Sequence, residues 1–199
     1  KERLESLGAR NVVVTGNIKL AHLPVISKEL KKPSALVVCG ASTHEGEEAL
    51  ILDAFAAFKK EHPEAVLLLV PRHPERFAKV AKMMEDFADE NGLSMQRYSQ
   101  NEVLSSDLVL VDALGELVNM YAISDIVILG GAFEPIGGHN AAEAAQFGCK
   151  IISGEHYFNQ KDIFEAIEGI AIVEANNLSK RLLQYGVLKR TEIKSKSDI

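Results

Sequence analysis

One glycine-rich segment late in the chain carries side chains that could bind a ligand. Two glycine pairs, Gly130-Gly131 and Gly137-Gly138, precede His139 and Asn140, and Glu143 follows three residues after Asn140. Glycines let a backbone approach a ligand closely, and a carboxylate can accept hydrogen bonds from hydroxyl groups. The same pattern fits a structural turn in which Asn140 caps a helix and Glu143 completes a capping box. Both interpretations are open at this point.

Two earlier segments contain groups that bind anions. Ser42 and Thr43 lie between Gly40 and Gly46, before a helical pattern, where hydroxyl and backbone N–H groups can face a phosphate. Arg72 follows an aliphatic run, and its guanidinium suits a phosphate or the edge of a base. Each feature also has a structural interpretation: Ser42 or Thr43 as a helix N-cap, and Arg72 as a solvated charge beside a helix start.

The sequence lacks the motifs of several enzyme classes. Neither G-x-G-x-x-G nor G-x-x-x-x-G-K-[ST] occurs, which disfavours dinucleotide oxidoreductases and P-loop NTPases. The G-x-S-x-G elbow of serine hydrolases is also missing. No D-x-D, H-x-x-x-H, H-E-x-x-H or C-x-x-C pattern occurs, so we expect no metal site.

The composition of the 199 residues is that of an ordinary soluble globular protein, with 47% hydrophobic and 25% charged residues. The formal net charge of -6 argues against a nucleic-acid-binding module, which neutralises phosphates with an excess of Lys and Arg. Cys39 and Cys149 border apolar runs and are expected to be buried, reduced thiols. The longest apolar run, residues 65–71, is too short to cross a bilayer.

Short apolar runs alternate with helical patterns along the chain, which predicts a parallel sheet. The expected helices of residues 46–60 and 74–91 each carry one apolar face, and the strands are apolar throughout, as in a sheet covered on both faces. The expected strands are residues 11–15, 35–40, 65–70, 95–98, 108–112, 125–129, 150–152 and 169–173. The predicted fold class is α/β, a Rossmann-like doubly wound parallel sheet.

We expect a single domain over residues 1–199, with a core of residues 8–185, a linker-like stretch of residues 23–33 and a polar tail of residues 186–199. The first residues include no initiator Met and resemble the last turn of a helix closed by Gly8, so we expect a piece of a longer protein. Ligands of open parallel sheets bind beyond the carboxyl ends of the strands. The loops at residues 40–46, 71–74, 113–117 and 130–140 are therefore the expected site.

In their order, these loops resemble the carboxyl-terminal half of the Kdo transferases. Those enzymes move 3-deoxy-D-manno-octulosonic acid (Kdo) from CMP-Kdo onto a lipid A precursor. The resemblance runs from about residue 8 to about residue 185. It rests on Thr15-Gly16-Asn17-Ile18-Lys19, Ser42-Thr43-His44-Glu45-Gly46-Glu47-Glu48, Val70-Pro71-Arg72-His73-Pro74-Glu75-Arg76-Phe77, Leu114-Gly115-Glu116-Leu117, and Gly137-Gly138-His139-Asn140 followed by Glu143.

The resemblance implies a GT-B glycosyltransferase, of which this chain is the half that binds the nucleotide donor. It implies that CMP is contacted by Pro71 and Arg72, by Leu114-Gly115-Glu116, and by Asn140-Ala141-Ala142-Glu143. Lys19 would stabilise negative charge on the departing phosphate; without the resemblance it would be an exposed surface lysine. CMP-Kdo is then the donor substrate, and no cofactor or metal is implied.

The resemblance also implies parts that this chain does not contain. The general-base glutamate and the surface that meets the lipid A precursor belong to an amino-terminal acceptor domain. We therefore expect this chain alone to be soluble and inactive. The full-length enzyme is expected to transfer Kdo with inversion, in lipopolysaccharide biosynthesis, at the cytoplasmic face of the bacterial inner membrane.

Two other functions fit the same loops. A nucleotide-sugar 2-epimerase would bind a UDP-sugar through its diphosphate and would need acid and base residues within the cleft. A non-catalytic α/β domain would use the glycine turns for structure alone.

Overall fold

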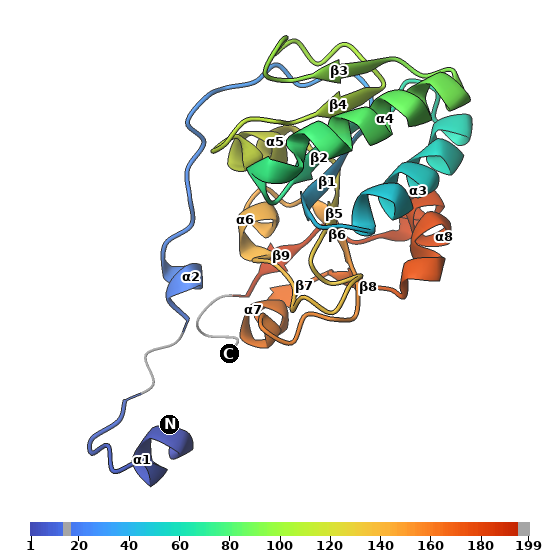
Figure 1. Ribbon diagram of the computed structural model, residues 1–199. Helices are drawn as coiled ribbons and strands as arrows, with labels where there is room; N and C mark the ends of the chain where they lie inside the picture. Colours follow the sequence, from blue (N-terminus) through green and yellow to red (C-terminus); the bar gives the residue numbers. More distant parts are fainter. Residues whose placement is uncertain (14–16, 195–199) are drawn as a thin grey trace.

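The computed structural model describes residues 1–13 and 17–194 and contains a parallel sheet with strand order β3-β4-β2-β1-β5-β6-β8 (Figure 1). Its strands are β1 Val37–Thr43, β2 Val66–Pro71, β3 Met95–Arg97, β4 Leu108–Leu110, β5 Ile126–Leu129, β6 Lys150–Ser153 and β8 Ala171–Ile172. A second, antiparallel pair joins β7 Ile167–Glu168 to β9 Glu192–Ile193. The predicted parallel α/β sheet is confirmed.

Helices cover both faces of the sheet (Figure 1). The α-helices are α1 Glu2–Ser6, α2 Ile18–Ala21, α3 Glu47–Glu61, α4 Phe77–Asn91, α5 Leu117–Ile123, α6 Ala142–Ala145, α7 Lys161–Glu165 and α8 Leu178–Leu183. Short 3-10 turns are η1 Pro74–Arg76, η2 Ala175–Asn177 and η3 Tyr185–Val187. One face packs against α3, α4 and α8, and the opposite face against α5, α6 and α7.

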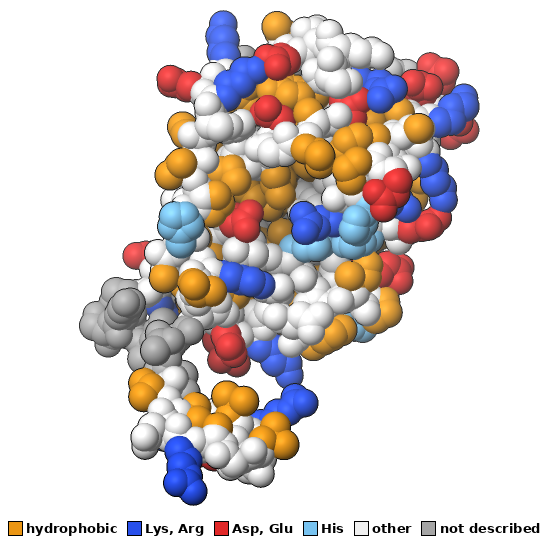
Figure 2. All heavy atoms as spheres, turned by 60° about the vertical axis from the view of Figure 1, so that its left-hand side comes forward, with side chains coloured by type: hydrophobic (Ala, Val, Ile, Leu, Met, Phe, Trp, Pro, Cys, Tyr) orange, Lys and Arg blue, Asp and Glu red, His pale blue; other side chains and the backbone are white. Residues whose placement is uncertain are grey.

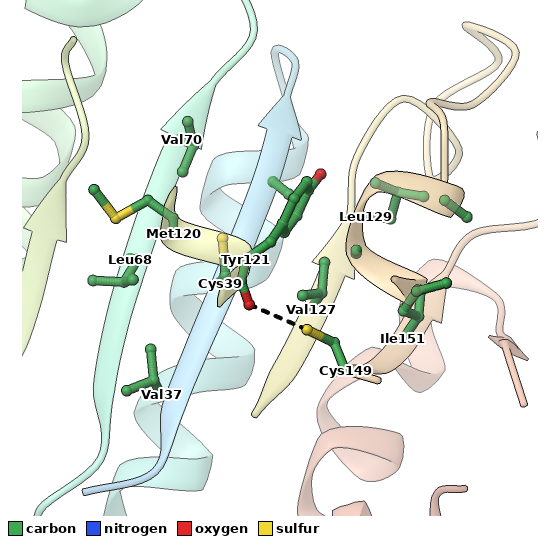
Figure 3. Close-up of a cluster of buried hydrophobic side chains, with 14 of the residues drawn as sticks. Val37, Cys39, Leu68, Val70, Met120, Tyr121, Val127, Leu129, Cys149 and Ile151 are labelled. Carbon is green, nitrogen blue, oxygen red and sulfur yellow. Dashed lines mark hydrogen bonds between the residues drawn. The ribbon is translucent and has the colours of Figure 1, made fainter. Parts of the chain in front are cut away.

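Two apolar clusters, one on each face of the sheet, form the core. Phe55 and Phe58 of α3 and Met84 of α4 are fully buried on one face, as their helical spacing predicts. On the other face, Tyr121 of α5 packs among strand side chains, and its carbonyl oxygen lies 3.4 Å from the Cys149 thiol (Figure 3). Both cysteines are free and buried, as expected, and burial raises the pKa of the Cys149 thiol to about 12.

The structure differs from the sequence-based expectations at both ends. Residues 11–13 form no strand, and residues 14 and 15 of that expected strand lie outside the described residues. In the expected tail, Leu188 and Thr191 are buried and β9 pairs with β7, so residues 186–194 pack on the domain; residues 195–199 are not described. The linker-like stretch of residues 23–33 contains no helix or strand.

Strand β1 is the point of the sheet at which the strand order changes direction, because later strands are added on both of its sides. After β1 the chain adds β2, then the edge strand β3, then β4 between β3 and β2, and it returns to place β5 on the other side of β1. The loops that follow β1 and β5 therefore diverge at the carboxyl edge of the sheet and leave a crevice there, where ligands of doubly wound sheets bind. A register shift between Ala41 and Thr43, with Ser42 at a φ of 53°, ends β1 at this crevice.

Candidate functional site

A cavity of about 400 Å³ lies at the carboxyl edge of the sheet, on the side that Figure 2 turns forward. Histidine side chains lie beside Lys and Arg side chains around a hollow in that view. The cavity is lined by Lys19, His22, Ser42, Arg72, Leu117, Tyr121, His139, Asn140, Glu143 and Gln160. A larger hollow of about 810 Å³ lies at the opposite edge, among segments that precede β1, β2 and β4, and it includes none of the expected site residues.

Lys19 reaches the cavity from α2, a single helical turn. The Asn17 side chain caps this turn by accepting a hydrogen bond from the Lys19 backbone N–H at 3.0 Å. The Lys19 Nζ donates to Gln160 Oε1, at the start of α7, over 3.3 Å. This contact directs the ammonium into the cavity. Thr15 and Gly16, which precede it in the same motif, lie outside the described residues.

Asn140 and Glu143 form a linked pair at the start of α6. Asn140 Oδ1 accepts from the Ala142 backbone N–H at 3.1 Å, a local turn contact, but the cap position of α6 is Ala141, so Asn140 is not the expected helix cap. Its amide nitrogen donates to Glu143 Oε1 at 3.1 Å. In a capping box the glutamate would accept from the backbone N–H of the cap residue instead. The Glu143 carboxylate thus faces the cavity, steadied by a side chain.

Ser42 and Arg72 come from the ends of adjacent strands. Ser42 is nearly buried and lines the cavity, and Arg72 is exposed at its edge. The Arg72 backbone N–H donates to the carbonyl oxygen of Thr43 at 3.0 Å, which ties the two strand ends together. The prediction that Pro74 begins a helix is confirmed, because η1 and α4 follow from it.

Thr43 does not line the cavity. Its hydroxyl is fully buried and donates to Glu48 Oε1 at 3.1 Å, and Glu48 also accepts from Arg76 at 2.9 Å. Neither Ser42 nor Thr43 caps α3, since Gly46 occupies the cap position without a side-chain contact. In the structure Thr43 therefore neither faces a phosphate in the cavity nor caps α3, and its hydroxyl makes a buried contact with Glu48.

A buried carboxylate joins the two crevice loops. Glu47, 1% exposed, accepts backbone hydrogen bonds from His44 at 3.0 Å, Gly131 at 2.8 Å and Phe133 at 3.1 Å. These bonds hold the loop after β5 against the first turn of α3. Gly130 is required beside it, because a Cβ there would lie 2.7 Å from the Ser42 carbonyl oxygen.

His139 and His44 meet across the crevice. Their Nε2 atoms are 2.8 Å apart, the ring centroids are 5.1 Å apart and the interplanar angle is 8°, so the rings meet edge to edge in nearly one plane, as a hydrogen bond between ring nitrogens requires. Burial, followed by the positive potential of His44 and Arg72, lowers the pKa of His139 to about 4. Burial and the nearby His73 also lower the pKa of His44. At neutral pH both rings are therefore uncharged.

The remaining residues implied by the resemblance lie beside the cavity rather than in its lining. Leu114 and Gly115 are exposed, and the Glu116 carboxylate accepts from Asn119 at 2.9 Å and Tyr98 at 3.3 Å. Three more, Pro71, Ala141 and Ala142, are buried.

Sequence reasoning missed several residues of the cavity wall. His22 follows Lys19 by one turn, and Tyr121 follows Leu117 by four residues, so a helical spacing rule could have found both. Gln160 carries no such signal, because only the tertiary fold brings α7 to α2. His139 belongs to the Gly137-Gly138-His139-Asn140 motif, but the sequence predicted no role for it.

Within residues 1–13 and 17–194, no group of three His, Cys, Asp or Glu side chains is placed to hold a metal ion. The helices of that part of the chain include none that is long and apolar enough to span a bilayer. The candidate site thus consists of cationic, amide and carboxylate side chains around one cavity.

Comparison with known proteins relates this geometry to a family. No family model matches the chain. It is 35% identical to the 3-deoxy-D-manno-octulosonic acid transferase of Haemophilus influenzae over 185 residues, covering 92% of this chain, and 35% identical to that of Rickettsia conorii over 200 residues, covering 96%. The crystal structure of the C-terminal CMP-Kdo binding domain of WaaA from Acinetobacter baumannii matches with a TM-score of 0.66 and 31% identity, over 76% of this chain and 80% of that domain.

The chain belongs to the Kdo transferase family. It spans 42% of the length of each of the two curated relatives. The predicted fold class, the Rossmann-like domain of a GT-B glycosyltransferase, is confirmed. These similarities do not favour the 2-epimerase or the non-catalytic domain considered from the sequence.

Proposed function

We propose that this chain is the donor-binding part of a Kdo transferase and that its cavity holds CMP-Kdo. The observation that carries the proposal is the convergence of Lys19, Arg72, Asn140 and Glu143, from three separate segments, on one cavity at the switch point of the sheet. The similarity of this chain to a CMP-Kdo binding domain supports the choice of CMP as the nucleotide. No cofactor enters the proposal, since CMP-Kdo is itself the donor.

The groups of the cavity suit the parts of that donor. The Glu143 carboxylate can accept hydrogen bonds from both ribose hydroxyls, and Asn140 holds it in place at 3.1 Å. The cations Lys19 and Arg72 can face the phosphate, where negative charge grows as CMP departs. Pro71, Leu114, Gly115, Glu116, Ala141 and Ala142 would contribute contacts from the rim and the backbone.

In the whole enzyme, an acceptor hydroxyl attacks the anomeric carbon of Kdo while the bond from that carbon to the phosphate oxygen breaks. CMP leaves with the electron pair, the hydroxyl proton passes to a glutamate of the acceptor domain, and the anomeric centre is inverted. The acceptor is a lipid A precursor, and the enzyme works at the cytoplasmic face of the bacterial inner membrane in lipopolysaccharide biosynthesis. Contact with the membrane comes only through the full-length protein.

Calorimetric titration of this chain with CMP, UDP and NAD tests the assignment. The proposal predicts that CMP binds at least about tenfold more tightly than UDP or NAD. Preference for UDP would favour a nucleotide-sugar 2-epimerase, and binding of none of them would favour a domain whose glycine turns are structural.

A further inference from the structure

The His44–His139 pair has a role that the binding of CMP does not use. His139 lines the cavity, whereas His44 lies behind it, and its backbone N–H is fixed by the buried Glu47. The His139 ring also packs on Gly131, where a Cβ would lie 2.7 Å from Cδ2. A ring held between a second histidine and a glycine has a defined orientation toward the cavity.

The contact between two Nε2 atoms limits the protonation states of the pair. At 2.8 Å one ring donates and the other accepts, so a neutral pair has one remaining ring N–H. One added proton gives both Nδ1 atoms a hydrogen and makes the pair a cation, while the hydrogen bond between the rings is kept. The pair can therefore gain a positive charge without rearrangement.

Charged and titratable groups surround the pair from every adjacent loop. They are Lys19 and His22 from α2 and its end, Glu47 and Glu48 from α3, Arg72, His73 and Arg76 from the segment after β2, Glu134 from the loop after β5, and Glu143 from α6. Burial, followed by these cations, keeps the pair neutral when no anion is bound. An anion placed in the cavity would offset their potential and favour uptake of a proton.

The charges in the cavity do not balance those of the proposed donor. Lys19 and Arg72 contribute two positive charges and Glu143 one negative charge, which leaves a net of one positive charge when His139 is neutral. CMP-Kdo carries one negative charge on its phosphodiester and one on the carboxylate of the sugar acid. The carbon that bears the phosphate oxygen also bears this carboxylate, so both anions occupy the same small region.

We propose that His139, backed by His44, binds the carboxylate of the donor's sugar acid, and that the pair takes up one proton when it does so. This inference rests on the proposed function and adds a second anionic subsite to the one for the phosphate. His139 is then a residue that distinguishes a sugar acid from a neutral sugar, and His44 is a positioning residue that acts through it.

Calorimetry of this chain with CMP and with CMP-Kdo, in two buffers of different ionisation enthalpy at pH 7.5, measures the proton uptake. A nearby carboxylate raises a histidine pKa by about 1–3 units, so the pKa of His139 should rise from about 4 toward neutrality when CMP-Kdo binds. We therefore expect CMP-Kdo to bind at pH 7.5 with uptake of a measurable fraction of one proton, and CMP with clearly less. The affinity for CMP-Kdo should fall between pH 7 and pH 8 by clearly less than tenfold. Above pH 7 the phosphate's own titration, with a pKa of about 6, contributes little.

Two substitutions assign the proton to the pair. His139→Gln should abolish the extra uptake and weaken CMP-Kdo binding by about tenfold, while CMP affinity changes by less than about twofold. His44→Gln leaves His139 in the cavity and should abolish most of the pH dependence. The matched control is His156→Gln, which alters an exposed histidine outside the cavity lining and should change neither quantity.

Three results would overturn the inference. These are equal proton uptake with CMP and CMP-Kdo, uptake that persists in both substituted proteins, and an equal loss of affinity for both ligands in His139→Gln. The last would make His139 part of the phosphate site. Failure of the unsubstituted chain to bind CMP at all would instead overturn the proposed function, and the carboxylate subsite with it.

Discussion

At the scale of single residues, Glu143 combines a structural contact with a place in the cavity wall. Glu143→Ala removes an acceptor for the ribose hydroxyls, so we expect CMP affinity to fall by about 1.5–3 kcal/mol, or roughly 10- to 150-fold. Because the hydrogen bond from the Ala142 backbone N–H to Asn140 remains at the start of α6, the free energy of unfolding should change by less than about 1 kcal/mol. Calorimetry and thermal unfolding of one sample measure both.

The control for Glu143→Ala is Glu165→Ala, which removes an exposed carboxylate of α7. It should change neither the CMP affinity nor the free energy of unfolding. A stability loss of about 1 kcal/mol in Glu143→Ala with unchanged CMP affinity would show that the residue only supports the helix.

Substitution of Lys19 should lower the reaction rate far more than the affinity for CMP. In the full-length enzyme, Lys19→Ala should lower kcat by about 10²–10³-fold, the scale of one lost electrostatic stabiliser of the transition state. Binding of CMP to this chain should change by less than about threefold, because Arg72, Asn140 and Glu143 remain. Lys60→Ala, at the exposed end of α3, is the matched control. An unchanged kcat would make Lys19 a surface lysine.

At the scale of elements, the first turn of α3 holds the loop after β5 through Glu47. Glu47→Ala leaves three backbone N–H groups without their acceptor, so we expect the free energy of unfolding to fall by at least about 3 kcal/mol. Glu47→Gln keeps one acceptor oxygen, so its free energy of unfolding should fall by less. Chemical denaturation measures both against Glu61→Ala, an exposed carboxylate at the other end of α3. Equal stability of all three variants would contradict this account of the loop.

Asp112 joins the end of β4 to β3 and to the segment that follows β3. It accepts from Ser99 N–H at 2.9 Å, Ser99 hydroxyl at 2.7 Å and Arg97 at 2.7 Å. Burial acts to raise the pKa of Asp112, but these hydrogen bonds outweigh it and hold the pKa below its usual value. The group therefore stabilises the fold above the unfolded-state pKa of about 3.9, and this contribution disappears as the pH falls through the folded-state value.

Asp112→Asn should accordingly destabilise the domain by about 1–3 kcal/mol at pH 7. The difference from the unsubstituted chain should shrink in denaturation curves taken at progressively lower pH below about 4. Asp86→Asn removes an exposed carboxylate that pairs with Lys82 one turn away, and it should change stability by less than about 0.5 kcal/mol. A difference that persists unchanged in acid would contradict the assignment.

The sheet could be predicted from the sequence because its strands are continuous apolar runs between helical patterns. Residues 11–13, the described part of the expected strand at residues 11–15, form no strand and show the limit of this reasoning. An apolar run indicates that a segment can pair, but not whether a partner edge exists. The four loops that follow strands were predicted from strand ends, whereas the place of Lys19, on α2, was implied only by the family resemblance. The contacts of Lys19 with Gln160 and of His44 with His139 join residues 141 and 95 positions apart, so no local pattern contains them.

At the scale of the whole molecule, the cavity at the carboxyl edge of the sheet competes with a larger hollow at the opposite edge as the nucleotide site. The chain carries a formal net charge of -6, yet its cations Lys19 and Arg72 converge with His139 on the smaller cavity at the carboxyl edge. The larger hollow, at the amino ends of the strands, is lined by side chains of both charge signs, among them Lys32, Lys59 and Glu102. It therefore has no clear preference for an anion. Size alone would favour the larger hollow, whereas charge and the switch point of the sheet favour the smaller cavity.

A titration of the isotope-labelled chain with CMP, followed by the backbone amide signals in NMR spectra, tests which hollow binds the nucleotide. The account predicts that the shifted signals concentrate at residues 42–44, 72–73 and 138–143, around the 400 Å³ cavity. Shifts confined to residues 29–35 and 102–107, around the 810 Å³ hollow, would contradict it, as would the absence of any shift.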